Sequence, residues 1–69
     1  MAPAFNAIEP GVLGVLVADQ SAETRAMVMQ AVRETMPGAR IHEAKSGPEA
    51  LALLRAQQID AVVMDVTMP

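Results

Sequence analysis

The amino-acid sequence predicts an α/β fold with the element order β-α-β-α-β and one parallel sheet. Three runs, at 12–18, 39–44 and 59–64, have the length of strands, and the first and third are rich in β-branched residues. Two segments with the apolar periodicity of helices separate them. Because strands and helices alternate with short connections, right-handed crossovers place the strands side by side.

The first strand is predicted over 12–18, where a continuous apolar run ends at Asp19. Such a run is typical of a strand that is buried on both faces of a parallel sheet. The helix that follows is predicted to begin at the N-cap Ser21 and to end at the Pro-Gly pair 37–38. Its apolar stripe consists of Val28, Ala31, Val32 and Met36. Arg25 is expected to face solvent.

The remaining elements follow the same alternation. The second strand, 39–44, alternates only in part, and its polar residues suit an edge position. The second helix is predicted to begin at Ser46, with Glu49 placed to complete a capping box. Its apolar stripe consists of Ala50, Leu51 and Leu54. The third strand, 59–64, is predicted to be buried on both faces, and it ends at Asp65.

Length and composition limit the possible classes of protein. A chain of 69 residues allows one small domain, here 12–69, after an irregular leader at 1–11 that contains two prolines. The net charge of −3 and five scattered basic residues argue against binding to nucleic acid. There is no apolar run of about 20 residues for a membrane span and no signal peptide. Without cysteine, a cytoplasmic location is expected.

Two aspartates follow the two most apolar strands. Asp19 ends the first strand and Asp65 ends the third. Parallel strands share a carboxyl edge, so the two side chains become neighbours if the first strand lies between the other two. Paired carboxylates favour a bound cation, and Mg²⁺ is the natural choice because it takes one or two carboxylates and several waters. The alternative that each aspartate only caps the segment after it stays open.

Three segments resemble the receiver domain of bacterial two-component response regulators. They are 15–19 (Val-Leu-Val-Ala-Asp), 46–51 (Ser-Gly-Pro-Glu-Ala-Leu) and 59–69, where Asp65 is followed by two residues and then Met-Pro. The resemblance covers 12–69 and the N-terminal half of a receiver only. It implies a three-layer, flavodoxin-like fold, cut to three strands and two helices, with strand order 2-1-3.

The resemblance also implies a function in a phosphorelay. Asp65 would be the phosphoacceptor, which receives a phosphoryl group from a histidine kinase. Mg²⁺ would be held by Asp19, Asp65 and the backbone carbonyl of Thr67. Such a domain is not an enzyme, beyond promoting its own phosphorylation and dephosphorylation.

The sequence departs from the family pattern in two respects. Gln20 stands where the family has a second acidic residue, so it is expected to be a weak ligand and Mg²⁺ to bind weakly. The sequence also ends at Pro69, before the second half of a receiver, and Lys45 is not placed to act as that half's lysine. The third strand would then be an exposed sheet edge, through which the chain is expected to self-associate.

Other functions remain as alternatives. The first is a truncated receiver or pseudo-receiver that acts as a protein-protein interaction module without phosphorylation. The second is a phosphatase of the haloacid dehalogenase type, which ranks last because that family requires an aspartate where Thr67 stands. His42, the single histidine, is expected to be a solvated edge-strand residue rather than a metal ligand.

Overall fold

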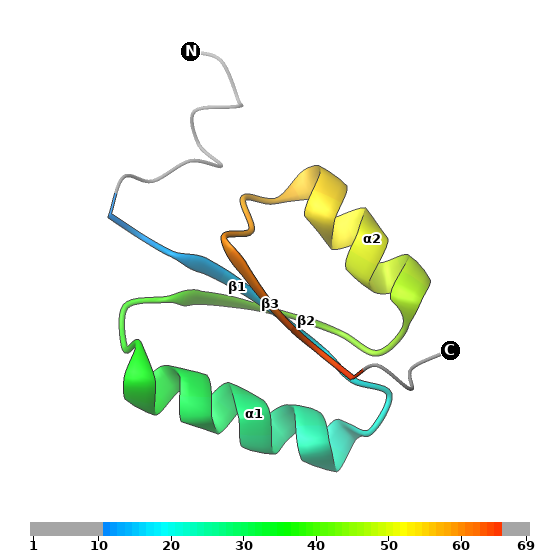
Figure 1. The fold of residues 1–69 in the computed structure, drawn as a ribbon, viewed down its shortest axis with the longest axis horizontal. Helices are drawn as coiled ribbons and strands as arrows, with labels where there is room; N and C mark the ends of the chain where they lie inside the picture. The colour runs from blue at the N-terminus through cyan, green and yellow to red at the C-terminus, as the bar shows by residue number, and fades with distance from the viewer. Residues whose placement is uncertain (1–10, 66–69) are drawn as a thin grey trace.

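The fold consists of a three-stranded parallel sheet between two helices (Figure 1). The computed structural model describes residues 11–65. The elements in chain order are β1 (Gly14–Ala18), α1 (Ala22–Thr35), β2 (Arg40–Ala44), α2 (Gly47–Ala56) and β3 (Ala61–Met64). The strand order is β2-β1-β3, and the two helices cover opposite faces of the sheet. The predicted element order and the strand order 2-1-3 are therefore confirmed.

β1 lies at the centre of the sheet, and its side chains form the core on both faces. Leu16 and Ala18 pack beneath α2, while Val15 and Val17 pack against α1. Every residue of β1 is buried, as predicted. The strand begins at Gly14 rather than at residue 12, because its pairing with β2 begins there.

α1 begins and ends where the sequence predicts. The hydroxyl oxygen of Ser21 accepts a hydrogen bond from the backbone N–H of Thr24 at 3.2 Å, which satisfies one of the free donors of the first turn. Of the predicted stripe, Val28, Val32 and Met36 pack on the β1 core. The fourth member, Ala31, is exposed, and this part of the prediction is wrong.

α2 begins with a modified capping box. The backbone N–H of Glu49 donates to Ser46 Oγ at 3.3 Å, and the Glu49 carboxylate accepts from the backbone N–H of Lys45 at 3.0 Å. Ala50 is buried as predicted, but the residue that joins it on the core is Leu53. The predicted stripe residues Leu51 and Leu54 are instead 47% and 43% exposed. α2 packs on β1 and β2, so only the side facing those two strands is covered.

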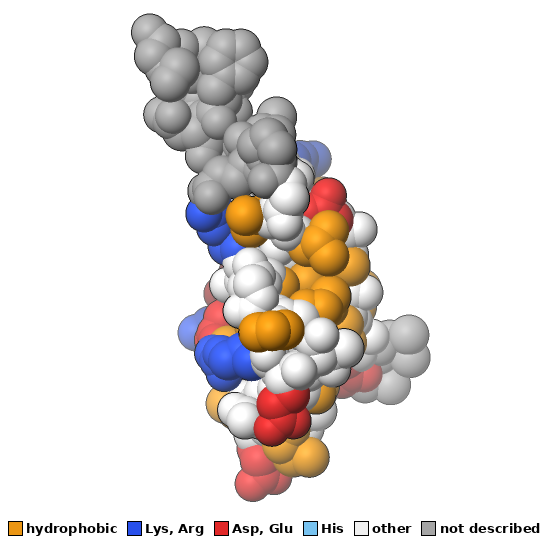
Figure 2. Space-filling view, turned by 90° about the vertical axis from the view of Figure 1, so that its left-hand side faces the viewer, with side chains coloured by type: hydrophobic (Ala, Val, Ile, Leu, Met, Phe, Trp, Pro, Cys, Tyr) orange, Lys and Arg blue, Asp and Glu red, His pale blue; other side chains and the backbone are white. Residues whose placement is uncertain are grey.

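β3 corrects the prediction of a strand buried on both faces. Its side chains are exposed, with Val62, Val63 and Met64 at 44%, 42% and 47%. The physical reason is position: β3 is an outer strand of the described sheet, and the helices pack chiefly on β1 and β2. Figure 2 shows several hydrophobic side chains next to one another toward the right-hand side of the view, with others scattered among polar and charged side chains.

β2 is the other outer strand, as its polar residues predict. The leader expected at 1–11 falls, except for Gly11, outside the described residues. Neither helix in the described part of the chain is long and apolar enough to cross a bilayer.

Candidate acidic site at the carboxyl edge of the sheet

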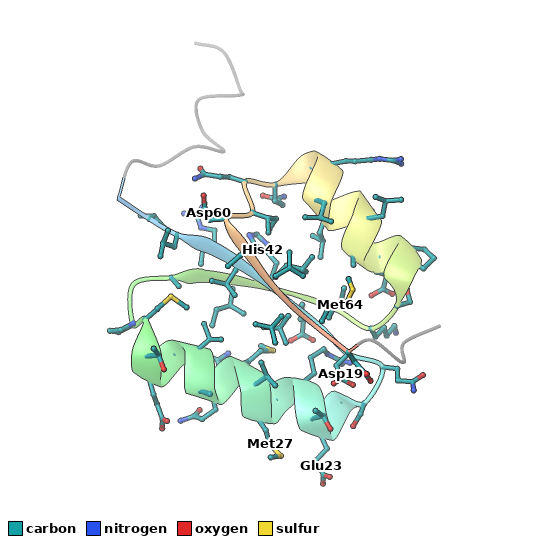
Figure 3. All side chains as sticks on the ribbon, in the orientation of Figure 1. Asp19, Glu23, Met27, His42, Asp60 and Met64 are labelled. Carbon is teal, nitrogen blue, oxygen red and sulfur yellow. The ribbon has the colours of Figure 1, made fainter. Side chains whose placement is uncertain are left out.

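The two aspartates predicted to be neighbours follow adjacent strands. Ala18 at the end of β1 pairs with Met64 at the end of β3, and the backbone N–H of Asp65 donates to the carbonyl of Ala18 at 3.0 Å. Figure 3 shows the labelled Asp19 close to this end of β3. The parallel pairing thus carries both acidic residues to the same edge of the sheet.

Both aspartates also belong to the same side of the sheet. Side chains alternate between faces along a strand, so Asp19 shares a face with Val17, and Asp65 shares a face with Val63. Val17 and Val63 are register partners, and Val17 packs against α1. A pocket of about 360 Å³ opens on this side. Its lining consists of Val17, Ala18, Asp19, Gln20, Ser21, Thr24, Val28, Val63, Met64 and Asp65.

Asp19 is held firmly by its neighbours. The residue is 9% exposed, and its backbone N–H donates to the carbonyl of Ala44 at 3.0 Å. Its Oδ1 accepts from the backbone N–H of Ser21 at 2.8 Å, and its carbonyl accepts from Arg25 Nη1 at 2.7 Å. This Oδ1 bond orients the carboxylate, whose oxygens together offer about four lone-pair sites.

The remaining predicted site residues differ in their settings. Asp65 is half-buried, and Gln20 is exposed at the pocket. Thr67 lies outside the described residues. The structure therefore brings together Asp19, Asp65 and Gln20.

The donor set in the pocket fits a hard cation with few protein ligands. Residues 11–65 contain no group of three or more histidine, cysteine, aspartate or glutamate side chains that could hold a metal ion. The pocket lining offers the carboxylates of Asp19 and Asp65 and the neutral amide of Gln20. Mg²⁺ is commonly held by one or two carboxylates and keeps several waters, and an open pocket of this size has room for them.

Two residues that the sequence analysis set apart from the site do lie apart from it. Lys45 lines a different pocket, of about 310 Å³, together with Arg25, Glu43 and Glu49. His42 pairs with Leu16 in the β1–β2 register and is half-buried on β2.

Arg25 is the residue of this region that sequence reasoning placed wrongly. It was expected to face solvent, but its side chain is only 13% exposed, and it binds both the Asp19 carbonyl and the Glu43 carboxylate. A signal was available in the helical spacing. Positions 25, 28, 29 and 32 lie on one face of a helix, and Val28, Met29 and Val32 pack on the sheet.

Comparison with known proteins adds a family assignment. Residues 15–69 match the family model described as the response regulator receiver domain. A comparison with curated proteins and another with solved structures gave no significant match.

Proposed function

Since the chain belongs to the response regulator receiver domain family, we propose that Asp65 accepts a phosphoryl group from a histidine kinase of a two-component system in the cytoplasm. The observation that carries this proposal is the shared pocket of Asp19 and Asp65 at the carboxyl edge of β1 and β3. A half-buried carboxylate there is accessible to a donor and has a second acidic group beside it.

The transfer is a simple displacement at phosphorus. A carboxylate oxygen of Asp65 attacks the phosphorus of a phosphohistidine, and the phosphorus–nitrogen bond breaks. Its electron pair stays on the histidine nitrogen of the kinase, and Asp65 becomes an acyl phosphate. The chain acts as the acceptor and not as an enzyme on a separate substrate, apart from promoting this transfer and the later hydrolysis of its own acyl phosphate, in which water releases inorganic phosphate and restores the Asp65 carboxylate.

Asp19, Asp65 and Gln20 would hold Mg²⁺, together with the backbone carbonyl of Thr67 that the family resemblance implies. When bound, the ion offsets the negative charge that builds up as a phosphoryl group approaches two carboxylates. The part of Asp19 is to present an oxygen without rearranging, because its backbone and Oδ1 are already fixed. Gln20 contributes no charge, so the ion is bound weakly.

Intact-mass analysis after incubation with acetyl phosphate and Mg²⁺ tests the proposal. The expected result is the added mass of one phosphoryl group on the unaltered chain and no addition on Asp65→Ala. Glu23→Gln is the matched control, since Glu23 is an exposed acidic residue in the first turn of α1. An adduct that persists in Asp65→Ala would refute the assignment of the acceptor.

Calorimetry tests the role assigned to Gln20. Gln20→Asp adds a carboxylate to the pocket and is expected to tighten Mg²⁺ binding about tenfold, the equivalent of roughly 1.4 kcal/mol of added attraction. Unchanged affinity would show that residue 20 is not a ligand.

The second candidate function is association without phosphorylation. The specific observation in its favour is the exposure of apolar side chains on α2, at Leu51 and Leu54, and along β3, which is an outer strand of the sheet that residues 11–65 form. A histidine kinase is the partner under the first proposal, whereas a second copy paired along β3 is the partner under this one. If acetyl phosphate gives no adduct on the unaltered chain, the second candidate is favoured.

A further inference from the structure

Arg25 on α1 binds the turn that joins β1 to α1. Its Nη1 donates to the carbonyl oxygen of Asp19 at 2.7 Å, and its Nε lies 3.4 Å from Oε1 of Glu43 on β2. The Arg25 side chain is 13% exposed, whereas that of Glu43 is 51% exposed. One guanidinium therefore connects α1, the turn and β2.

Arg25 does not line the acidic pocket, but the peptide that it binds leads directly into it. The carbonyl of Asp19 belongs to the peptide between Asp19 and Gln20, and both of these residues line the pocket. Rotation of that peptide would turn both side chains. On the other side of the turn, the N–H of Ser21 donates to Asp19 Oδ1 at 2.8 Å. The two hydrogen bonds together define the orientation of the turn.

We propose that Arg25 is a positioning residue, which keeps the Asp19 carboxylate and the Gln20 amide directed at the pocket where Mg²⁺ and the phosphoryl group bind. The identity of the ligands, Mg²⁺ and the phosphoryl group, rests on the proposed function. The effect of Arg25 on the orientation of the turn does not. A hydrogen bond from a charged donor is stronger than a neutral one, and a mostly buried donor is little screened by salt. The Glu43 pair is half exposed and is expected to matter less.

The geometric part is tested first, by amide hydrogen exchange measured by NMR on the full chain. Arg25→Gln is expected to lower the protection of the Ser21 amide about tenfold relative to the β1 amides, since it removes a charged hydrogen bond. Arg25→Lys, which keeps a cationic donor, restores most of the protection. Glu43→Gln removes the exposed ion pair only and stays close to the unaltered chain.

Titration with Mg²⁺ then tests the link to the site. Arg25→Gln is expected to weaken Mg²⁺ binding about tenfold, with Arg25→Lys between it and the unaltered chain. If the unaltered chain does not bind Mg²⁺, the proposed function fails, while the Ser21 amide still decides whether Arg25 positions the turn.

Two results would overturn the inference. One is equal loss of protection at Ser21 and in β1, which indicates a merely structural role. The other is an effect of Glu43→Gln as large as that of Arg25→Gln. Should Arg25→Gln fail to fold, Arg25→Lys must keep the Ser21 protection for the inference to stand.

Discussion

Gly14 is a position where the structure leaves no room for a side chain. A Cβ placed on it would lie 2.0 Å from the backbone carbonyl oxygen of Gln58. The close approach accompanies two hydrogen bonds between Gly14 and Asp60 at the start of β1. The Gly14 N–H donates to the side-chain Oδ2 of Asp60, and the Asp60 N–H donates to the Gly14 carbonyl, each at 2.7 Å. Because the obstacle is backbone, it cannot move aside by changing a rotamer.

The cost of Gly14→Ala follows from these contacts. Forcing an extra methyl group into a packed site costs about 1–3 kcal/mol. Displacing Gln58 also weakens the two hydrogen bonds to Asp60, at about 1 kcal/mol each. We expect a loss of about 3 kcal/mol in the free energy of unfolding, which is most of what a core of this size supplies, at about 3–5 kcal/mol.

Urea unfolding followed by far-ultraviolet circular dichroism measures this loss, since the chain has no tryptophan or tyrosine to report by fluorescence. If the free energy of unfolding falls by about 1 kcal/mol per molar urea, the urea midpoint of Gly14→Ala lies about 3 M below that of the unaltered chain. A variant that is already unfolded without urea also agrees with the prediction. Gly38→Ala is the matched control. A Cβ at Gly38 meets nothing within 4 Å, and its φ is not positive, so its midpoint stays equal or rises slightly. Equal midpoints for the two variants would refute the reasoning.

Three further predictions concern the core, a helix cap and the open edge. Leu16→Ala removes a fully buried side chain and is expected to lower the free energy of unfolding by about 2–5 kcal/mol in the same titration, whereas Leu51→Ala, at 47% exposed, changes it far less. Ser46→Ala removes the cap of α2 and lowers the free energy of unfolding by about 1 kcal/mol, which thermal unfolding measures. Light scattering at rising protein concentration is expected to show dimers or larger species for the unaltered chain. Val62→Lys is expected to stay monomeric, because a charged side chain on β3 opposes edge pairing. A monomeric unaltered chain would contradict this prediction.

Local patterns were enough for the elements, whereas the neighbouring placement of the two aspartates also needed the strand order 2-1-3 that the family resemblance implies. The apolar run before Asp19 and the Ser-Gly-Pro-Glu start of α2 are signals carried by consecutive residues. The folded chain has a strand and a helix start at these positions, as these signals predict. The meeting of Asp19 and Asp65 at one edge follows from topology, because parallel strands with helical crossovers all end on the same side. That the two residues are neighbours on this edge depends further on the strand order, in which β1 lies beside β3.

The errors concern residues whose burial depends on partners far away in the sequence. Leu51, Leu54 and the β3 residues have apolar patterns. The helices pack chiefly on β1 and β2, so these side chains stay exposed among the described residues. Arg25 shows the reverse case, a charged residue whose side chain is mostly buried. It lies on the face of α1 that packs on the sheet, where it binds the carbonyl of Asp19 and the carboxylate of Glu43.

The sequence by itself determined the order of the elements, their caps and the edge at which the acidic residues gather, since these depend on periodicity and on chain direction. Only the tertiary structure decided which side of each helix touches the sheet, how closely Gln58 approaches Gly14, and that Arg25 donates to the carbonyl of Asp19. The physical reason is that packing and hydrogen bonds between distant segments depend on positions in space, which no local pattern specifies.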